Sequence, residues 1–238
     1  MCKEGDKTDF TCIAKTVYDM KLRQRIVNRL GQGVHACWPI LQCFTAGNMW
    51  GHLPTRRQLF AMSFAALVNG GRGITWYSYG SAVRTERWTD LCELAGWLKE
   101  LTPALVARDS VDQPTVEVLG GPARDAYGQV PVTAVLRDVG SEKYLLTVNA
   151  SHEPVRARVR TATAAKDIED EWDGFAVHVY RILPDGTTIV TTSASDAVQR
   201  TAANELGKYL GERIGGQTLT VEGKGAAVFH IGNTEFAR

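Results

Sequence analysis

Segments with helical periodicity alternate with short apolar runs over residues 13–106, and this alternation strongly restricts the possible folds. Apolar residues recur every three or four positions in residues 13–30 and 85–106, which predicts two amphipathic helices, and a further helix is expected over residues 56–69. Residues 34–44 form an almost continuous apolar run, as expected of a strand buried on both faces, and residues 73–80 form an aromatic and β-branched run bounded by glycines. Strands that alternate with helices indicate a parallel α/β fold.

Capping and breaking residues support these limits. Thr55 is a good N-cap for the helix over residues 56–69, and Gly70 and Gly71 mark its end. Pro39 lacks a backbone donor and weighs against a long strand around it.

Beyond Pro114 the pattern changes to short alternating strands without a helix between them. Strands are expected at residues 115–119, 130–137, 144–149, 155–160 and 175–182. Turn-forming residues separate them, and this spacing predicts a small antiparallel β-sandwich. The acidic run 167–171 is expected to be a solvent-facing turn of that sandwich.

A third pattern follows Pro184. Residues 187–191 predict a strand, Ser195 caps a helix that extends to about residue 214, and strands are expected at residues 219–221 and 228–231. So small a β-α-β-β unit leaves an unpaired sheet edge, which suggests that its domain continues beyond the last residue.

Charge and composition exclude several classes of partner. The 238 residues carry a net charge of +1, which favours neither nucleic acid nor an anionic membrane surface. The apolar runs are too short to cross a bilayer, and the first residues lack the apolar region of a signal peptide. We therefore expect no nucleic-acid partner and no membrane partner. Localisation stays open, because an excerpt of a longer protein would lack its own N-terminus.

The order of three segments resembles the C-terminal end of the barrel in β-galactosidase-like (β/α)8 glycoside hydrolases. These segments are QGVHACWPILQCF at residues 32–44, RRQL at residues 56–59 and GRGITWYSY at residues 71–79. Residues 88–101 look like the closing helix of such a barrel. The resemblance implies that residues 1–107 are the last βα units of an incomplete barrel.

Two later regions extend the resemblance. YLLTVN at residues 144–149 and VHVYR at residues 177–181 look like the β-sandwich that trails such a barrel, which implies a β-sandwich over residues 108–183. AANELGKYL at residues 202–210 and IGNTE at residues 231–235 resemble the accessory α/β domain of α-glucuronidases and β-N-acetylhexosaminidases.

That accessory domain does no chemistry itself in the family, so the resemblance implies a supporting unit over residues 184–238, cut short at its end. The expected fold class is mixed α/β: a partial (β/α)8 barrel end, then an antiparallel β-sandwich, then a small β-α-β-β unit.

Carboxylates are missing where glycoside hydrolysis would need them. The reaction uses two carboxyl groups, which lie at the carboxyl ends of strands in a barrel. No Asp or Glu occurs between Asp19 and Glu86, and both predicted barrel strands lie in that interval. We therefore predict no catalytic residue in this chain. The acidic residues of the closing helix are expected to face solvent; they are Glu86, Asp90, Glu93 and Glu100.

Aromatic and amide side chains at the strand ends instead suggest sugar binding. The candidate substrate-binding residues are Trp76, Tyr79, Gln42, Phe44, Trp50 and His52. Strand alternation places Trp76 and Ser78 on one side and Tyr77 and Tyr79 on the other, so not all of these residues can face a ligand. Trp76 is favoured for the cleft, with packing in the core as the alternative.

Metal and cofactor sites are not indicated. The five cysteines include no CxxC pair, and the histidines lack HxxH or HExxH spacing. Calcium binding by residues 167–171 is conceivable, but the EF-hand spacing is missing. No phosphate-binding or dinucleotide-binding glycine pattern occurs, so we expect no cofactor.

The leading hypothesis is a C-terminal fragment of a glycoside hydrolase that acts on carbohydrate and is inactive alone, because its catalytic carboxylates lie upstream. The alternative is a non-catalytic carbohydrate-binding or structural module. A third idea is self-association, because an incomplete barrel exposes strand edges and the apolar helix face around Trp88 and Trp97.

Overall fold

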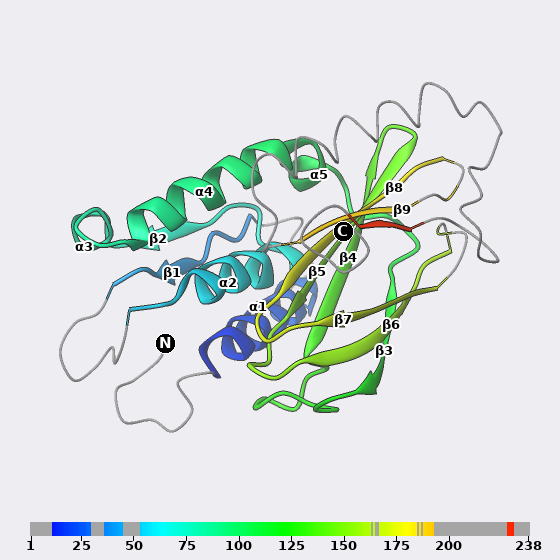
Figure 1. The fold of residues 1–238 in the computed structure, drawn as a ribbon, viewed down its shortest axis with the longest axis horizontal. Coiled ribbons are helices and arrows are strands. Elements are labelled where there is room, and N and C mark those ends of the chain that lie inside the picture. Colours follow the sequence, from blue (N-terminus) through cyan, green and yellow to red (C-terminus); the bar gives the residue numbers. More distant parts are fainter. Residues whose placement is uncertain are drawn as a thin grey trace.

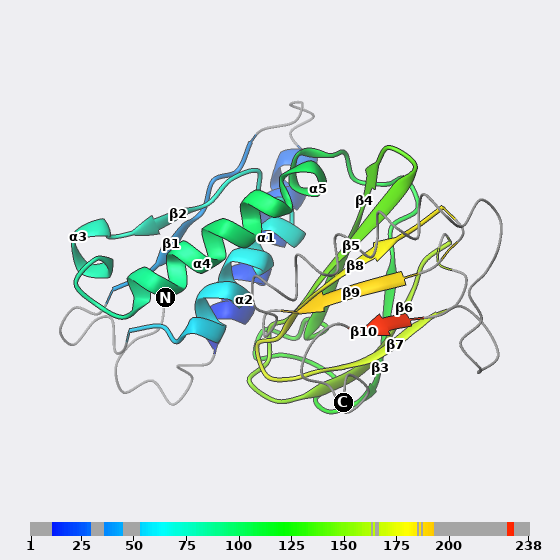
Figure 2. The same cartoon turned by 45° about the horizontal axis from the view of Figure 1, so that its top comes forward.

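The protein is a mixed α/β structure built in three layers. The computed structural model describes residues 11–29, 36–44, 53–162, 164, 167–184, 186, 188–192 and 228–230. Helices and a short parallel strand pair form the first layer, a five-stranded sheet the second and a three-stranded sheet the third (Figures 1 and 2). Among the described residues, none of the helices combines the length and the apolar character needed to cross a membrane.

The first layer alternates helices and strands in the expected order. Its elements are α1 (Thr11–Arg29), β1 (Ile40–Gln42), α2 (Arg56–Val68), β2 (Thr75–Tyr77), α3 (Tyr79–Ala82), α4 (Arg87–Glu100) and α5 (Thr102–Val106). β1 and β2 pair in parallel, with Leu41 opposite Trp76. The single helix expected over residues 85–106 is two helices that meet at Leu101, since Pro103 cannot donate a hydrogen bond to the preceding turn.

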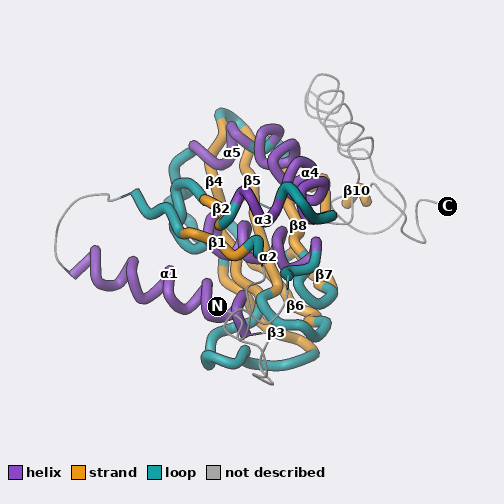
Figure 3. The backbone as a smooth tube through the Cα atoms, turned by 90° about the vertical axis from the view of Figure 1, so that its left-hand side faces the viewer, coloured by secondary structure: helices purple, strands orange, loops and turns teal. Residues whose placement is uncertain are grey.

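Helix α2 lies at the centre of the molecule. Thr55 accepts a hydrogen bond from the Gln58 backbone N–H, and the Gln58 side chain accepts one from the Thr55 N–H, so the predicted N-cap is confirmed as a capping box. Every residue from Gln58 to Val68 is buried, because α1, α4, β1 and the five-stranded sheet all pack against this helix. Seen from the helical side, the strands run behind α2 (Figure 3).

The expectation that residues 34–44 form a strand buried on both faces is wrong. β1 is only three residues long, Ile40 is 68% exposed and Trp38 is exposed as well. Leu41 of β1 and the following Cys43 pack on the helices, whereas Ile40, on the opposite face of the strand, is exposed. Trp38 lies against Gly73, where a Cβ atom would come within 2.7 Å of its ring.

The parallel sheet does not form a closed barrel in the part of the chain that the structure describes. It consists of β1 and β2 alone. Trp97 is buried in the core, so this half of the apolar helix face expected to drive self-association is already covered, whereas Trp88 remains partly exposed. A barrel end over residues 1–107 and association through it stay predictions.

Two sheets with antiparallel pairing make up the other layers. The five-stranded sheet has the order β10-β9-β8-β5-β4, and the three-stranded sheet has the order β3-β6-β7. Their strands are β3 (Thr115–Gly120), β4 (Val132–Val139), β5 (Glu142–Asn149), β6 (Val155–Arg160), β7 (Ile168–Trp172), β8 (Val177–Ile182), β9 (Thr188–Thr192) and β10 (Val228–His230). The two sheets share a buried apolar core.

Successive side chains of β5 and β8 point to opposite faces of the five-stranded sheet, and both faces are buried. Leu146, Val148 and Val179 face the helices, whereas Leu145 and Tyr180 face the three-stranded sheet. The middle of each strand therefore lacks the polar face of an antiparallel strand that has one side in water.

The five-stranded sheet contains strands from both sides of the boundary expected at residues 183/184. Strand β9 pairs antiparallel with β8, and β10 pairs in parallel with β9. The helix expected from Ser195 and the strand expected at residues 219–221 lie outside the described residues.

The acidic run 167–171, expected to be a turn, is in fact part of strand β7. Ile168, Asp170 and Trp172 face the interior, while Glu169 and Glu171 face solvent. The sequence pattern concealed this strand because three carboxylates in succession, Glu169, Asp170 and Glu171, interrupt the apolar alternation expected of a strand.

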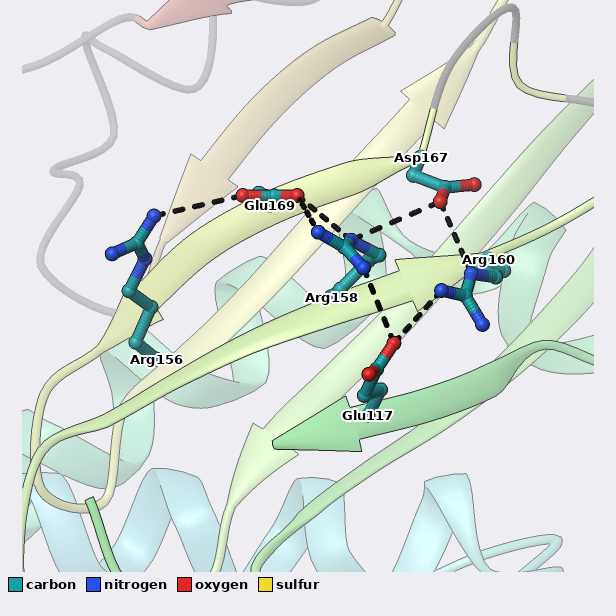
Figure 4. A network of polar contacts seen from close by, with 6 residues as sticks. All are labelled: Glu117, Arg156, Arg158, Arg160, Asp167 and Glu169. Carbon is teal, nitrogen blue, oxygen red and sulfur yellow. Dashed lines mark hydrogen bonds and ion pairs between the residues drawn. The ribbon is translucent and has the colours of Figure 1, made fainter. Parts of the chain in front are cut away.

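The solvent face of the three-stranded sheet carries a cross-strand ladder of ion pairs (Figure 4). Arg158 on the central strand reaches Glu169 on one side, at 2.6 Å, and Glu117 on the other, at 3.3 Å. Arg160 repeats this arrangement with Asp167 at 3.1 Å and Glu117 at 2.8 Å. Arg158 therefore bridges all three strands, and Arg160 connects β6 to β3 and to the residue just before β7. The register of the sheet matches opposite charges.

Arg137 joins the helical layer to the five-stranded sheet. Its side chain is buried, Nη1 donates to the Ala107 carbonyl at 3.0 Å, and Nη2 donates to the Leu67 carbonyl at 3.3 Å. Its Nε lies 2.9 Å from Oδ1 of Asp109. Burial lowers the pKa of Arg137 and Asp109 opposes that shift, so a charged guanidinium holds the end of α2 and the segment after α5 on strand β4.

Replacing Arg137 with Met should destabilise the protein by roughly 3 kcal/mol, because two buried carbonyls and Asp109 lose their partner. The free energy of unfolding from urea denaturation measures this change. Arg156→Gln, at an exposed position of the ladder, is the control and should stay close to the wild type. Equal unfolding midpoints for Arg137→Met and the wild type would contradict the role of this arginine.

Candidate functional site

The candidate site lies at the carboxyl ends of β1 and β2. Gln42 is opposite Tyr77 at the end of the parallel pair, and the Cys43 N–H donates to the Tyr77 carbonyl at 2.7 Å. The segment after β2 continues into α3, and α4 begins beside it (Figure 1). Ligands bind at this edge of parallel α/β sheets, because the loops that follow the strands converge there.

Phe44 and Tyr77 form one aromatic pair at this edge. Their ring centroids are 5.2 Å apart and the rings stand at 82°, which is an edge-to-face contact. Phe44 is buried, whereas Tyr77 is 59% exposed. Phe44 therefore supports the Tyr77 ring, and Tyr77 presents its surface to solvent.

Tyr79 and Trp88 form a second pair. Their centroids are 5.5 Å apart at an interplanar angle of 89°. Tyr79, on α3, is 68% exposed, and Trp88, on α4, is 39% exposed. Trp88 was not among the predicted site residues, because helical periodicity assigned it to an apolar face. Its position next to the charged residues Glu86 and Arg87 was the available sign of an exposed helix start.

Gln42 and Trp76 are both less exposed than Tyr77 and hydrogen-bond within the protein. Gln42 is buried, and its side-chain amide donates to the Phe44 carbonyl at 2.9 Å. The Trp76 indole N–H donates to Oγ of Ser63 on α2 at 3.3 Å, and the ring packs against the core. Strand alternation thus separates Trp76 from Tyr77, as expected, but it is Tyr77 that faces solvent. Trp50 and His52 lie outside the described residues.

Two ion pairs lie on the helices beside the aromatic pairs. Arg87 Nη1 is 2.6 Å from Oδ2 of Asp90, and these two side chains are only 14% and 16% exposed. Arg56 Nε donates to Oε2 of Glu93 at 3.0 Å. The expectation that Asp90 and Glu93 face solvent as ordinary surface charges is therefore wrong, because arginines bind them in partly buried contacts.

Cys43 lies beneath this edge, at the end of β1. It is fully buried, and burial raises the pKa of its thiol; nearby Arg87 lowers that pKa and Asp90 raises it. A neutral, covered thiol is a poor nucleophile. Within the described ranges, no group of three or more His, Cys, Asp or Glu side chains is arranged to hold a metal ion.

The geometry offers two exposed aromatic surfaces, polar groups beside them and no carboxylate on either strand end. Comparison with models of protein families finds no match, and comparison with curated proteins finds no match either. The chemistry of the site therefore rests on its own residues.

Cys43 should resist alkylation, whereas Cys92, which is exposed on α4, should react rapidly. Burial and a raised pKa both reduce the accessible thiolate of Cys43. Iodoacetamide labelling of the native protein at about pH 8, followed by peptide mass mapping, measures each rate. The same labelling in denaturant is the control and should make the two cysteines equally reactive. Rapid native labelling of Cys43 would show that this edge is open.

Proposed function

We propose that the carboxyl ends of β1 and β2 bind carbohydrate as one wall of the cleft of a glycoside hydrolase. The observation that carries the proposal is the presence of two edge-to-face aromatic pairs, each with an exposed ring, directly after the two parallel strands. The resemblance of residues 32–44 and 71–79 to the end of a glycoside hydrolase barrel points to the same chemistry.

Aromatic rings and paired charges suit a neutral sugar. The C–H face of a pyranose ring packs on an aromatic surface, while its hydroxyl groups need a few well-placed polar groups. Tyr77, Tyr79 and Trp88 supply such surfaces. Arg56 and Arg87 are each engaged by a carboxylate, so they are poorly placed to attract an anionic sugar.

The two pairs also suggest a ligand of more than one sugar ring. Tyr77 and Tyr79 are two residues apart, so their Cα atoms are separated by at most roughly 7 Å. That separation is comparable to the length of one sugar unit. A ligand that packs on both Tyr77 and the Tyr79–Trp88 pair would extend over adjacent units of an oligosaccharide.

Hydrolysis needs two carboxyl groups that this edge does not supply. Neither strand end carries Asp or Glu, and Asp90 is engaged by Arg87. In the proposed enzyme, other strands provide both catalytic carboxylates, and the residues described here position the sugar.

Binding should weaken when either exposed platform is removed. In calorimetric titrations with neutral β-linked gluco-, galacto-, manno- and xylo-oligosaccharides of one to four units, Trp88→Ala should lower the affinity about tenfold, or about 1.4 kcal/mol. Trp38→Ala is the matched control, because Trp38 is an exposed tryptophan at the amino end of β1. Tetrasaccharides should bind more tightly than monosaccharides. Absence of binding to every sugar would overturn the proposal.

The purified chain should not hydrolyse 4-nitrophenyl β-galactoside or β-glucoside. The physical reason is that a paired Asp90 and solvent-exposed carboxylates cannot act as the facing acid and nucleophile. Release of nitrophenolate measures the reaction. Turnover that disappears in Asp90→Asn would instead place a catalytic carboxylate within this chain.

The second candidate function is that of a non-catalytic module. The three-stranded sheet favours a structural role for such a module. The solvent face of this sheet consists largely of ion-paired arginines and carboxylates. Such a face keeps the edge strands in register and soluble. If sugar binding occurs but belongs to the sheets, Trp88→Ala should leave it unchanged and substitutions in the ladder should abolish it.

A further inference from the structure

A cluster of three titratable side chains connects the two sheets at their interior faces. Asp170 projects from β7, whereas His178 and Tyr180 project from β8. The Tyr180 hydroxyl donates to Oδ2 of Asp170 at 2.7 Å, and Nδ1 of His178 lies 3.0 Å from the same oxygen. One carboxylate oxygen of the three-stranded sheet thus binds two groups of the five-stranded sheet.

Trp172 adds a second connection beside this cluster. It is fully buried at the end of β7, and its indole N–H donates to Oγ1 of Thr147 on β5 at 2.9 Å. Its ring stacks on the His178 ring with a centroid separation of 5.2 Å. The Thr147 hydroxyl in turn donates to the His178 carbonyl at 2.9 Å. Polar contacts of β7 therefore hold both β5 and β8.

Among the residues that the structure describes, the charges nearest to the cluster along β6 and β7 lie on the other face of the sheet. Oδ1 of Asp170 accepts a hydrogen bond from the Glu171 backbone N–H at 2.8 Å. The charged side chains of the neighbouring positions on β6 and β7 lie on the opposite, solvent face; they are Arg156, Arg158, Glu169 and Glu171. His178 pairs with Thr147 of β5 and with Thr192 of β9, and neither threonine carries a charge. The ionisation of Asp170 thus acts mainly on His178 and Tyr180.

We propose that Asp170, His178 and Tyr180 form an acid-sensitive latch, whose opening releases the three-stranded sheet while the five-stranded sheet stays packed on the helices. The asymmetry follows from the two interfaces. The five-stranded sheet packs on the helices through the larger apolar core and the buried Arg137. The two sheets share a smaller apolar core, in which the partly buried Asp170 lies between Ile168 and Trp172 on β7.

The direction of the pH dependence follows from Asp170. Burial opposes its ionisation, but hydrogen bonds from His178 and Tyr180 outweigh burial, and the pKa of Asp170 is lowered from its usual value. Burial and Asp170 raise the pKa of Tyr180, so its hydroxyl remains a donor. A carboxyl group with a lowered pKa stabilises the fold fully above its unfolded pKa of about 4, and this contribution is lost as pH falls through the folded pKa.

Segment-resolved hydrogen exchange of the full chain tests the latch. After correction for intrinsic rates, acidification from about pH 7 to about pH 3 should reduce the protection of residues 115–120, 155–160 and 168–172 by roughly tenfold or more. Residues 56–68 of α2 should retain theirs. Asp170→Asn should already show the reduced protection of the three segments at pH 7, and a smaller further loss in acid.

Two controls separate the latch from other acid effects. Glu171→Gln changes the neighbouring outward-facing carboxylate and should behave as the wild type. The acid response due to the outer ion pairs should persist in Asp170→Asn and shrink in 1 M salt, where exposed charges are screened.

Wild-type protection in Asp170→Asn at pH 7 would overturn the proposal, as would simultaneous opening of all segments in acid. If Asp170→Asn does not fold, Tyr180→Phe removes one hydroxyl and should weaken the same three segments selectively at pH 7. Unchanged protection in that variant would reject the latch as well.

Discussion

The buried guanidinium of Arg137 connects the parts of the structure that the chain itself separates. It binds carbonyls at the end of α2 and after α5 from a position on β4, and Asp109 balances its charge. This contact positions α2 against the five-stranded sheet, and α2 in turn packs on β1 and α4 and hydrogen-bonds to Trp76 of β2. A buried charge tolerates little displacement of its partners, so the first two layers have a defined relative position.

That position determines what the candidate site can present. With α2 buried on all sides, Trp76 hydrogen-bonds to Ser63 and packs inward, and Tyr77 is left facing solvent. Helix α4 brings Trp88 to Tyr79 and Asp90 to the end of β1, near Cys43. The same packing that stabilises the helices thus produces an aromatic edge with paired charges, which supports the proposal of sugar binding without strand-borne catalysis.

Local signals predicted much of the fold. The capping box at Thr55 begins α2, and expected strands correspond to β3, β4, β5, β6, β8, β9 and β10. Strand β7 escaped prediction because Asp170 is an inward-facing carboxylate whose partners, His178 and Tyr180, come from another strand. Of the predicted site residues, Phe44 and Tyr79 lie at the strand-end edge and Gln42 is buried, while Trp88 of the candidate site was not among them; a sugar-binding role for any of these residues stays a prediction.

The sequence by itself determined the local elements, because caps, prolines and apolar periodicity act over a few residues. It also determined that neither parallel strand carries a carboxylate. Only the tertiary structure decided which faces became buried. Ile40 and Trp38 are exposed although they belong to an apolar run, and Arg137 and Asp170 lie inward although they are charged. Burial depends on elements distant in the chain, and their packing energies outweigh the preference of any single residue.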